Sequence, residues 1–283
     1  TQRDMLMVSD WLMGFWVGSR HDWINTLASA ALVILIVYPP ALLSISFQLS
    51  FADVSAIIAG SMVWPGKREP LPANVWNTLR RRFLTFVWIS ALAILGTFPL
   101  VLHYFNQASV AGLATNLIVV PLVGLVIVPA GLLGAVFVAL SPALGHLFWH
   151  LAGWGAELVC RTIHQVASWP WASVQTVTPS TVEIMLFYLL CGLALFWRRL
   201  PYRAVAAVVV LSLCFLDMGY WIHRRYGQTD LKVTVLDVGQ ASANLIEFPG
   251  GFTMMVDGGG FSDNAIFDVG DRILAPILWR KKI

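Results

Sequence analysis

Charge is the scarcest property of this sequence. Only 12% of the 283 residues are Asp, Glu, Lys or Arg, whereas a typical soluble domain is about 25% charged. Together with 58% hydrophobic residues and a mean hydropathy of +0.74, this scarcity excludes a soluble globular protein. It predicts an α-helical polytopic membrane bundle. The net charge of +3 is small, so the placement of the charges is more informative than their sum.

Several motifs that carry chemistry are also missing. The sequence has no GxxxxGK(S/T) and no GxGxxG, which excludes a nucleotide-driven motor within this chain. It contains no nucleophile elbow and no HExxH either. The three cysteines lie in apolar runs without ligand spacing and are interpreted as small core residues. The chain opens without a cleavable signal and stops in mid-pattern, so we expect an internal part of a longer protein.

Long apolar runs dominate what is present. A spanning helix needs about 20 mostly apolar residues, and the candidates are 4–19, 24–38, 45–64, 83–102, 110–140, 181–197 and 204–222. The 110–140 stretch is too long for one plain span and too short for two. Because it also holds Gly112, Pro121 and Gly124, we expect a broken or re-entrant helix. In lipid, such a helix must border protein or a wet cavity.

The basic residues of the loops predict an orientation, because Lys and Arg concentrate on the cytoplasmic side. If the spans alternate, one side receives Arg20, Lys67, Arg68, Arg80, Arg81, Arg82, Arg198, Arg199 and Arg203. The loops of the other side, at 39–44, 103–109 and 169–180, contain none. We therefore expect a multi-pass protein of the bacterial inner membrane, with the residues after Trp221 outside the cytoplasm.

Polar side chains interrupt the apolar stretches. A central Asp in a span costs about 2.5–3.5 kcal/mol to insert, so such residues usually face a bundle interior. One interpretation is that they line or relay along a transport path; the other is that they bond neighbouring helices or lie at the interface. Glycines here can instead serve close helix packing. The path candidates in these stretches are Gln48, Ser50, Asp53, Asn106, Gln107 and Asn116.

A further amphipathic helix is predicted over 143–168, with a polar stripe at helical spacing. The stripe consists of His146, His150, Gly153, Glu157, Arg161 and His164. Glu157 and Arg161 are ordered correctly for an i,i+4 pair. Three interpretations stay open: an interfacial helix, the wall of an aqueous passage in which Glu157 and Arg161 become path candidates, or a metal site. His146 and His150 have usable spacing for a metal, but no carboxylate or thiol lies within one turn.

The pattern changes after Asp230. Lys232–Val238 alternates and is rich in β-branched residues, and 244–248 and 252–256 repeat this pattern around Pro249-Gly-Gly. This predicts a strand followed by a hairpin. We therefore divide the chain into a transmembrane domain over 1–225 and the start of a β-rich extracytoplasmic domain over 231–283.

Three blocks of sequence resemble the ComEC competence proteins. The first is Phe47-Gln-Leu-Ser-Phe51. The second is Phe105-Asn-Gln-Ala-Ser109, followed by Leu113-Ala-Thr-Asn-Leu117 and Val120-Pro-Leu-Val123. The third is Leu231-Lys-Val-Thr-Val-Leu-Asp-Val-Gly-Gln240 with Met255-Val-Asp-Gly-Gly259. Their order and spacing also fit, and the likeness runs from about residue 3 to the end.

The resemblance implies a membrane channel that passes one DNA strand into the cytoplasm during natural transformation. It also implies that 231–283 begins a metallo-β-lactamase-like αβ domain, with Asp237 and Asp257 beside the family's metal site. The family's His-x-His-x-Asp-His motif would follow Ile283, so we expect no cofactor and no catalysis in this fragment and a divalent metal only in a full-length protein. Implied partners are single-stranded DNA, the bilayer, an extracytoplasmic DNA receptor and a cytoplasmic helicase or motor.

Two other functions stay open. A secondary transporter or permease for another anionic substrate could use the same interrupted helix. A membrane-anchored metal-dependent hydrolase would use the helices only as an anchor, which fits poorly with polar residues in several spans.

Overall fold

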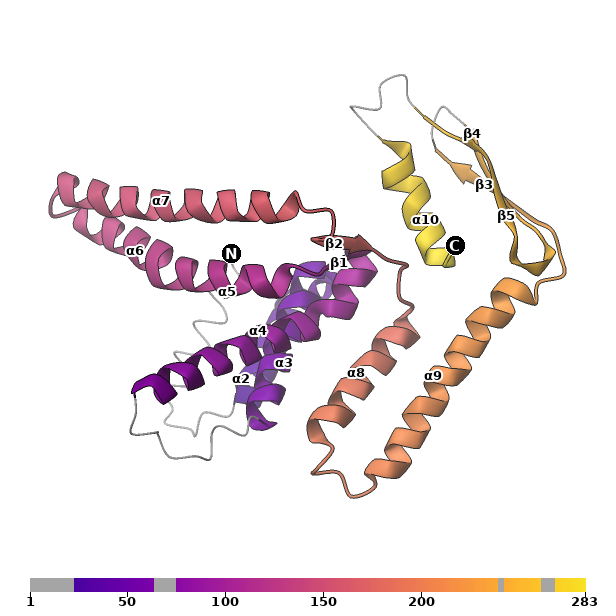
Figure 1. Cartoon of the computed structure of the whole chain (residues 1–283), viewed down its shortest axis with the longest axis horizontal. Coiled ribbons are helices and arrows are strands. Elements are labelled where there is room, and N and C mark those ends of the chain that lie inside the picture. Colours follow the sequence, from indigo (N-terminus) through magenta and orange to yellow (C-terminus); the bar gives the residue numbers. More distant parts are fainter. Residues whose placement is uncertain (1–22, 64–74, 239–241, 261–267) are drawn as a thin grey trace. The chain divides into compact units, whose positions relative to one another are not determined.

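The computed structural model describes residues 23–63, 75–238, 242–260 and 268–283. Within them the fold is mostly helical, with two small sheets (Figure 1). The predicted span over 4–19 lies outside the described residues, as do Arg20, Lys67 and Arg68 from the charge argument.

The chain divides into two compact units. The first is Thr1–Phe98 with Gln107–Val174, and the second is Pro99–Asn106 with Gln175–Ile283. Each is described by itself below.

The first unit begins with two apolar helices that match the predicted spans. They are α2 (Trp23–Val37) and α3 (Ile45–Val63), joined by the 3-10 turn η1 (Pro39–Leu43). Consecutive prolines at the start of η1 prevent α2 from continuing. A small buried cluster of Ile34, Ala41 and Phe47 ties the three elements together.

The next helix, α4 (Val75–Phe105), has 31 residues. The prediction of a helix over 83–102 is therefore too short at its N-terminal end. The basic residues Arg80, Arg81 and Arg82 lie within the helix rather than in a loop. Arginine is a good helix former, whereas hydropathy detects only the apolar part of a helix.

Small residues bring α3 and α4 into close contact. A Cβ atom added at Gly60 would lie 2.1 Å from the Leu92 side chain. One added at Gly96 would lie 2.4 Å from Ala56 Cβ and 2.8 Å from the Ala52 carbonyl. Neither site can hold a larger side chain without moving the helices apart.

The stretch predicted to be broken or re-entrant is a continuous helix, and this corrects the prediction. It comprises α5 (Gly112–Leu122), the π-helical segment η3 (Val123–Ile127) and α6 (Val128–Phe137). Pro121 lies inside α5 without ending the helix. A π turn follows it, in which the Val128 N–H donates to the Val123 carbonyl, and the helix then continues as α6.

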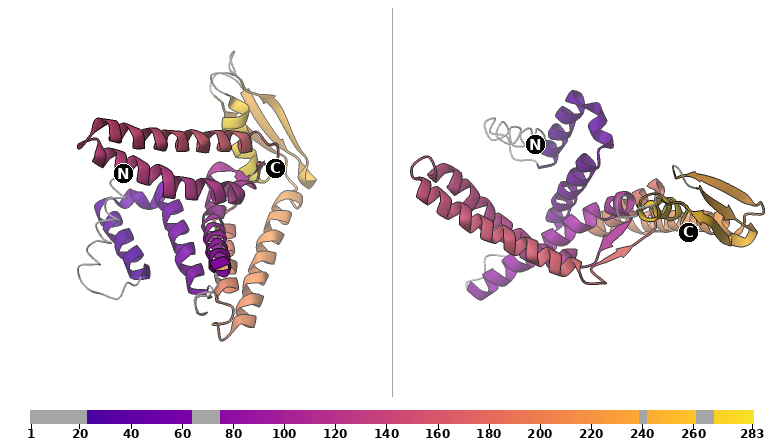
Figure 2. Two further views of the ribbon diagram at one scale, coloured as in Figure 1. Left: turned by 60° about the vertical axis from the view of Figure 1, so that its left-hand side comes forward. Right: turned by 90° about the horizontal axis from the view of Figure 1, so that it is seen from above.

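The amphipathic helix α7 (Pro142–Ala167) agrees with its prediction within one residue at each end. It runs back alongside α6 (Figures 1 and 2). A Cβ atom at Gly134 of α6 would lie 2.3 Å from Trp149 of α7, so Gly134 permits close packing as predicted. Gly124 and Gly131 have no neighbouring atom within 4 Å of such a Cβ and serve no contact of this kind.

The second unit contains an antiparallel helix pair, α8 (Thr181–Phe196) and α9 (Arg203–Tyr226) (Figure 1). A capping box fixes the start of α8. Ser180 Oγ accepts from the Glu183 N–H at 3.2 Å, and Glu183 Oε2 accepts from the Ser180 N–H at 2.7 Å. Two donors at the helix start are thereby paired.

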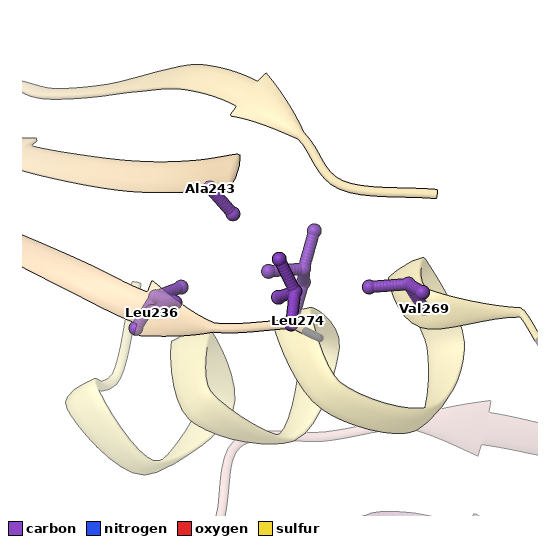
Figure 3. Packing of buried hydrophobic residues seen from close by; sticks show 5 residues of the cluster. Leu236, Ala243, Val269 and Leu274 are labelled. Atoms are coloured by element: carbon purple, nitrogen blue, oxygen red, sulfur yellow. The ribbon is translucent and has the colours of Figure 1, made fainter. Parts of the chain in front are cut away.

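A three-stranded antiparallel sheet follows α9 and confirms the predicted strand and hairpin. Its strands are β3 (Lys232–Asp237), β4 (Ser242–Glu247) and β5 (Thr253–Gly258), in the order β3-β4-β5, with the turn η4 (Pro249–Gly251) between the last two. The helical segment η5 (Gly270–Leu274) and α10 (Ala275–Lys281) cover one face. Leu236, Ala243, Val269 and Leu274 belong to the core between them (Figure 3).

Four described helices are long and apolar enough to cross a membrane by length and composition. They are Ile45–Val63, Val75–Phe105, Gly112–Phe137 and Arg203–Tyr226. The apolar helices α2 and α8 are shorter. Many large apolar side chains on these helices are exposed, as expected of surfaces that face lipid.

Candidate functional site

Three of the path candidates lie on α3, but they do not share one face. Helical residues are about 100° apart, so Ser50 and Asp53 lie on one side and Gln48 on the other. Gln48 Nε2 donates to the Leu42 carbonyl at 3.0 Å. This hydrogen bond ties the amide to the turn that precedes the helix.

Asp53 is a half-buried residue in a candidate span, and one oxygen of its carboxylate is buried without a partner among the described residues. Its Oδ1 atom has no hydrogen-bond partner in the described part of the chain. The preceding residue, Ala52, faces Gly96 of α4, so Asp53 lies beside the α3–α4 contact. An unsatisfied buried polar group costs about 1–3 kcal/mol, and more when it is charged. Helix packing therefore does not explain why α3 has a carboxylate at position 53.

Asn116 is half-buried in the second turn of α5. A cavity of about 350 Å³ beside α4 does not include it, because the lining residues are Thr78, Arg81, Arg82, Thr85, Phe86 and Ile89. That cavity contains no path candidate. The assignment of Gln48, Ser50, Asp53 and Asn116 to one path stays a prediction.

Asn106 holds the C-terminal end of α4 in the second unit. It adopts the left-handed conformation with φ 53°, which is common for the residue after a helix. The side chain is buried, and Nδ2 donates to Thr178 Oγ1 at 2.5 Å. The Thr176 N–H donates to the Asn106 carbonyl at 2.9 Å. These bonds give Asn106 a structural role, whatever else it does.

Gln107 begins the short strand β1 (Gln107–Ser109), which pairs with β2 (Ser173–Gln175). Gln107 Nε2 donates to Ser173 Oγ at 2.7 Å. The polar stretch between the apolar runs is therefore an ordered two-stranded connection rather than an irregular loop.

The polar stripe of α7 lies nearly opposite its packed face. Gly145 and Gly155 are buried against the preceding helix, whereas Glu157 and Arg161 form an exposed i,i+4 ion pair of 2.6 Å. Their side chains are 59% and 76% exposed, so the pair adds little to stability. The described residues contain no group of three potential metal ligands, and the stripe gives no support to a metal site.

Asp237 and Asp257 lie at the same end of the sheet, near the C-terminal ends of the two outer strands β3 and β5. Strand β4 separates them, which places their backbones roughly 10 Å apart. Asp257 has φ 64°, and its Oδ1 accepts from the Gly258 N–H at 2.8 Å beside a β-bulge. Since no third ligand joins them among the described residues, the residues present do not fit a complete metal site.

The second unit contains a cavity of about 720 Å³. It lies where α8 begins and α9 ends, and β3, the β4–β5 turn and α10 complete its wall. Glu183 pairs with Lys282, and Glu247 pairs with Lys281. Lys282 Nζ lies 4.0 Å from the centre of the Trp221 ring. The indole Nε1 of Trp221 is buried and has no hydrogen-bond partner within the described ranges.

Sequence reasoning did not identify this cavity. The signal that could have revealed it is the density of aromatic and basic residues in the last two turns of α9, Tyr220-Trp-Ile-His-Arg-Arg-Tyr226. The lysines of α10 that complete it are distant in sequence.

Comparison with known proteins gives these features a context. The family model described as competence protein matches residues 1–201. The ComE operon protein 3 of Bacillus subtilis (strain 168) is 26% identical over 294 residues, which cover 99% of this chain and 36% of that protein. The chain thus spans little more than a third of the length of this relative. No solved structure matches the chain significantly.

Proposed function

This chain belongs to the competence protein family, and from that premise we propose that its helices form part of an inner-membrane channel that passes single-stranded DNA into the cytoplasm during natural transformation. The match over residues 1–201 carries this proposal. It covers three of the four described helices that are long and apolar enough to span a membrane. The channel would therefore be a property of the helices rather than of the sheet.

Asp53 adds a physical reason for a wet path. An unpaired carboxylate oxygen buried in a candidate span is costly in lipid and is usually kept for a function. Water or a passing strand beside the α3–α4 contact would satisfy it. Gln48, Ser50 and Asn116 would supply neutral polar groups along the path, whereas the amide groups of Asn106 and Gln107 already donate to Thr178 and Ser173.

Weak contacts suit this role, because a conduit must also release its cargo. Single strands are otherwise held by basic grooves and stacked aromatic rings. Of the path candidates only Arg161 is basic, and it would act with Glu157 on α7. Since the sequence contains no nucleotide motif, a cytoplasmic helicase or motor would supply the pulling force, and an extracytoplasmic receptor would deliver the DNA.

Residues 231–283 are proposed to begin an extracytoplasmic metallo-β-lactamase-like domain. A three-stranded sheet covered by a helix is compatible with such a start. Asp237 and Asp257 would then lie near a metal whose other ligands come from elsewhere in a longer protein. We assign no catalysis to the residues of this chain.

The test is uptake of labelled DNA by cells that carry full-length protein with Asp53→Leu, Gln48→Leu or Asn116→Leu. Nuclease treatment separates DNA bound outside from DNA taken in. For Asp53→Leu we expect normal external binding and internalisation reduced about 100-fold, the factor that corresponds to about 2.7 kcal/mol. Ser55→Leu, at an exposed position of the same helix, is the matched control. Normal internalisation in all three variants at normal protein level would remove the path assignment.

A further inference from the structure

The cavity of the second unit changes character along its depth. At its mouth are Arg224 and Arg225, in the last turn of α9, and Lys282. Further from the helix ends, the wall is apolar apart from Asp217 and includes Leu186, Phe187, Leu190, Cys214, Met218 and Ile222. Cys214 lies 12 residues before Tyr226, which corresponds to about 18 Å along the helix. A ligand that matches this wall is charged at one end and apolar at the other.

The charge at the mouth is positive. Five cations line the cavity, namely Arg224, Arg225, Lys232, Lys281 and Lys282, against the carboxylates of Glu183, Asp217 and Glu247. Two of those carboxylates already pair with lysines. Arg224, Arg225 and Lys232 then remain against the single carboxylate of Asp217, so the excess charge is positive and the mouth favours an anion.

The arginines have donors to offer. Arg224 Nη1 donates to Tyr220 Oη at 3.4 Å, and Arg225 Nη1 donates to the Lys282 carbonyl at 3.0 Å. A guanidinium carries five N–H donors in a fork that matches phosphate oxygens. Both side chains are exposed. The buried, unpaired Trp221 N–H adds a further donor that an oxygen in the cavity could satisfy.

We propose that this cavity binds an anionic phospholipid, with the phosphate at Arg224 and Arg225 and the start of an acyl chain in the apolar groove between α8 and α9. The position fits, because α9 is a candidate span that ends at this mouth. A volume of about 720 Å³ lies within the ordinary range for small-ligand sites. The inference does not depend on DNA passage.

A nucleic acid strand fits the same wall less well. Bases bind through stacking on free aromatic faces, but Lys282 covers one face of Trp221. The ring centres of Phe248 and Phe252 lie 5.6 Å apart, with the two rings tilted by 51°, so these aromatic side chains already contact each other. The side chains of Leu190 and Cys214 in the wall also provide no positive charge for the phosphates of a nucleic acid strand.

The test uses the full chain in nanodiscs, with native mass spectrometry to count retained lipid. Phosphatidylglycerol and phosphatidylcholine of equal chain length are supplied together, and a thymidine oligonucleotide serves as competitor. We expect wild-type protein to retain phosphatidylglycerol selectively. Arg224→Gln with Arg225→Gln should reduce its retention about 10-fold, as losing about 1.4 kcal/mol of binding does.

Arg198→Gln with Arg199→Gln removes the same charge at the other end of the helix pair and should leave retention unchanged. Cys214→Phe keeps every charge, fills the groove and should also reduce retention. The proposal is overturned by equal retention of the two lipids, by retention that neither the Arg224/Arg225 nor the Cys214 variant changes, or by displacement of the lipid by the oligonucleotide at equimolar concentration.

Discussion

Asp53 of the first unit and the carboxylates of Glu183 and Glu247 in the second unit have different surroundings. In the second unit, Glu183 and Glu247 each face a lysine across a contact between elements far apart in sequence. In the first unit, Asp53 lies beside two closely packed helices, and one of its oxygens has no partner within the described residues. A carboxylate in an ion pair has a structural role, because it holds two elements of the fold together. Asp53 has no such role in the described part of the chain, and we infer that it is present for function.

The largest effect is expected from filling the space that holds α3 against α4. Gly96→Leu would place a side chain against the Ala52 carbonyl, which a Cβ atom alone approaches to 2.8 Å. Overpacking of this kind costs about 1–3 kcal/mol and occasionally more, so we expect little protein in the membrane fraction by immunoblot. Gly131→Leu, at a site with no atom within 4 Å, is the control. Equal accumulation of both variants would show that the α3–α4 contact does not exist.

The paired carboxylates should behave as structural groups. Glu247→Gln leaves Lys281 without its partner in a site where both side chains are less than a third exposed. We expect a loss of about 1–3 kcal/mol in the free energy of unfolding, measured by denaturant titration in detergent.

The double variant with Lys281→Gln removes both charges and completes a cycle with the two single variants. We expect it to recover part of the loss, with a coupling energy of about 1 kcal/mol. If the changes in unfolding free energy of the two single variants add up to that of the double variant, the Glu247–Lys281 ion pair does not contribute to stability.

Replacing Asp53 should raise the free energy of unfolding, whereas replacing Glu247 should lower it. Asp53→Leu removes an unpaired buried oxygen, so the same titration should show stability raised by about 1–3 kcal/mol while DNA uptake falls. A gain of stability with a loss of function is common at functional sites. Asp53→Asn should lie between. A destabilised Asp53→Leu protein would indicate that the carboxylate has a structural partner after all.

The smallest effect is expected at Arg161 on α7. Because Arg161 and Glu157 are exposed, Arg161→Gln should change stability by less than about 0.5 kcal/mol. This variant separates the two remaining interpretations of the stripe. If uptake of labelled DNA also stays normal, the helix is interfacial, whereas reduced uptake at unchanged stability assigns Arg161 to the path.

Most elements could be predicted from sequence because hydropathy and β-alternation are local signals. The helices α2, α3, α8 and α9, the hairpin β4–β5 and the amphipathic α7 follow from them. Pro121 and Gly124 misled the prediction, since the helix continues through both residues, whereas a sequence pattern can only count a proline as a break. The N-terminal extension of α4 was missed because its arginines suppress the hydropathy signal.

The candidate site was less predictable. The polar side chains could be found by their contrast with apolar neighbours, but their partners could not. Nothing in the sequence shows that Asn106 bonds Thr178 or that Gln48 bonds the Leu42 carbonyl. The cavity near Trp221 depends on lysines about 60 residues away in the chain, and only the fold brings them together.

The central claim is that Asp53 borders water within the membrane. It is tested most directly by Asp53→Cys and Ser55→Cys in full-length protein whose native cysteines are replaced, treated in intact membranes with a thiol reagent that reacts only in water. We predict rapid labelling at position 53 and little at position 55, which is exposed on the surface of α3 and is expected to face lipid. Labelling at neither position, or equally at both, would contradict it.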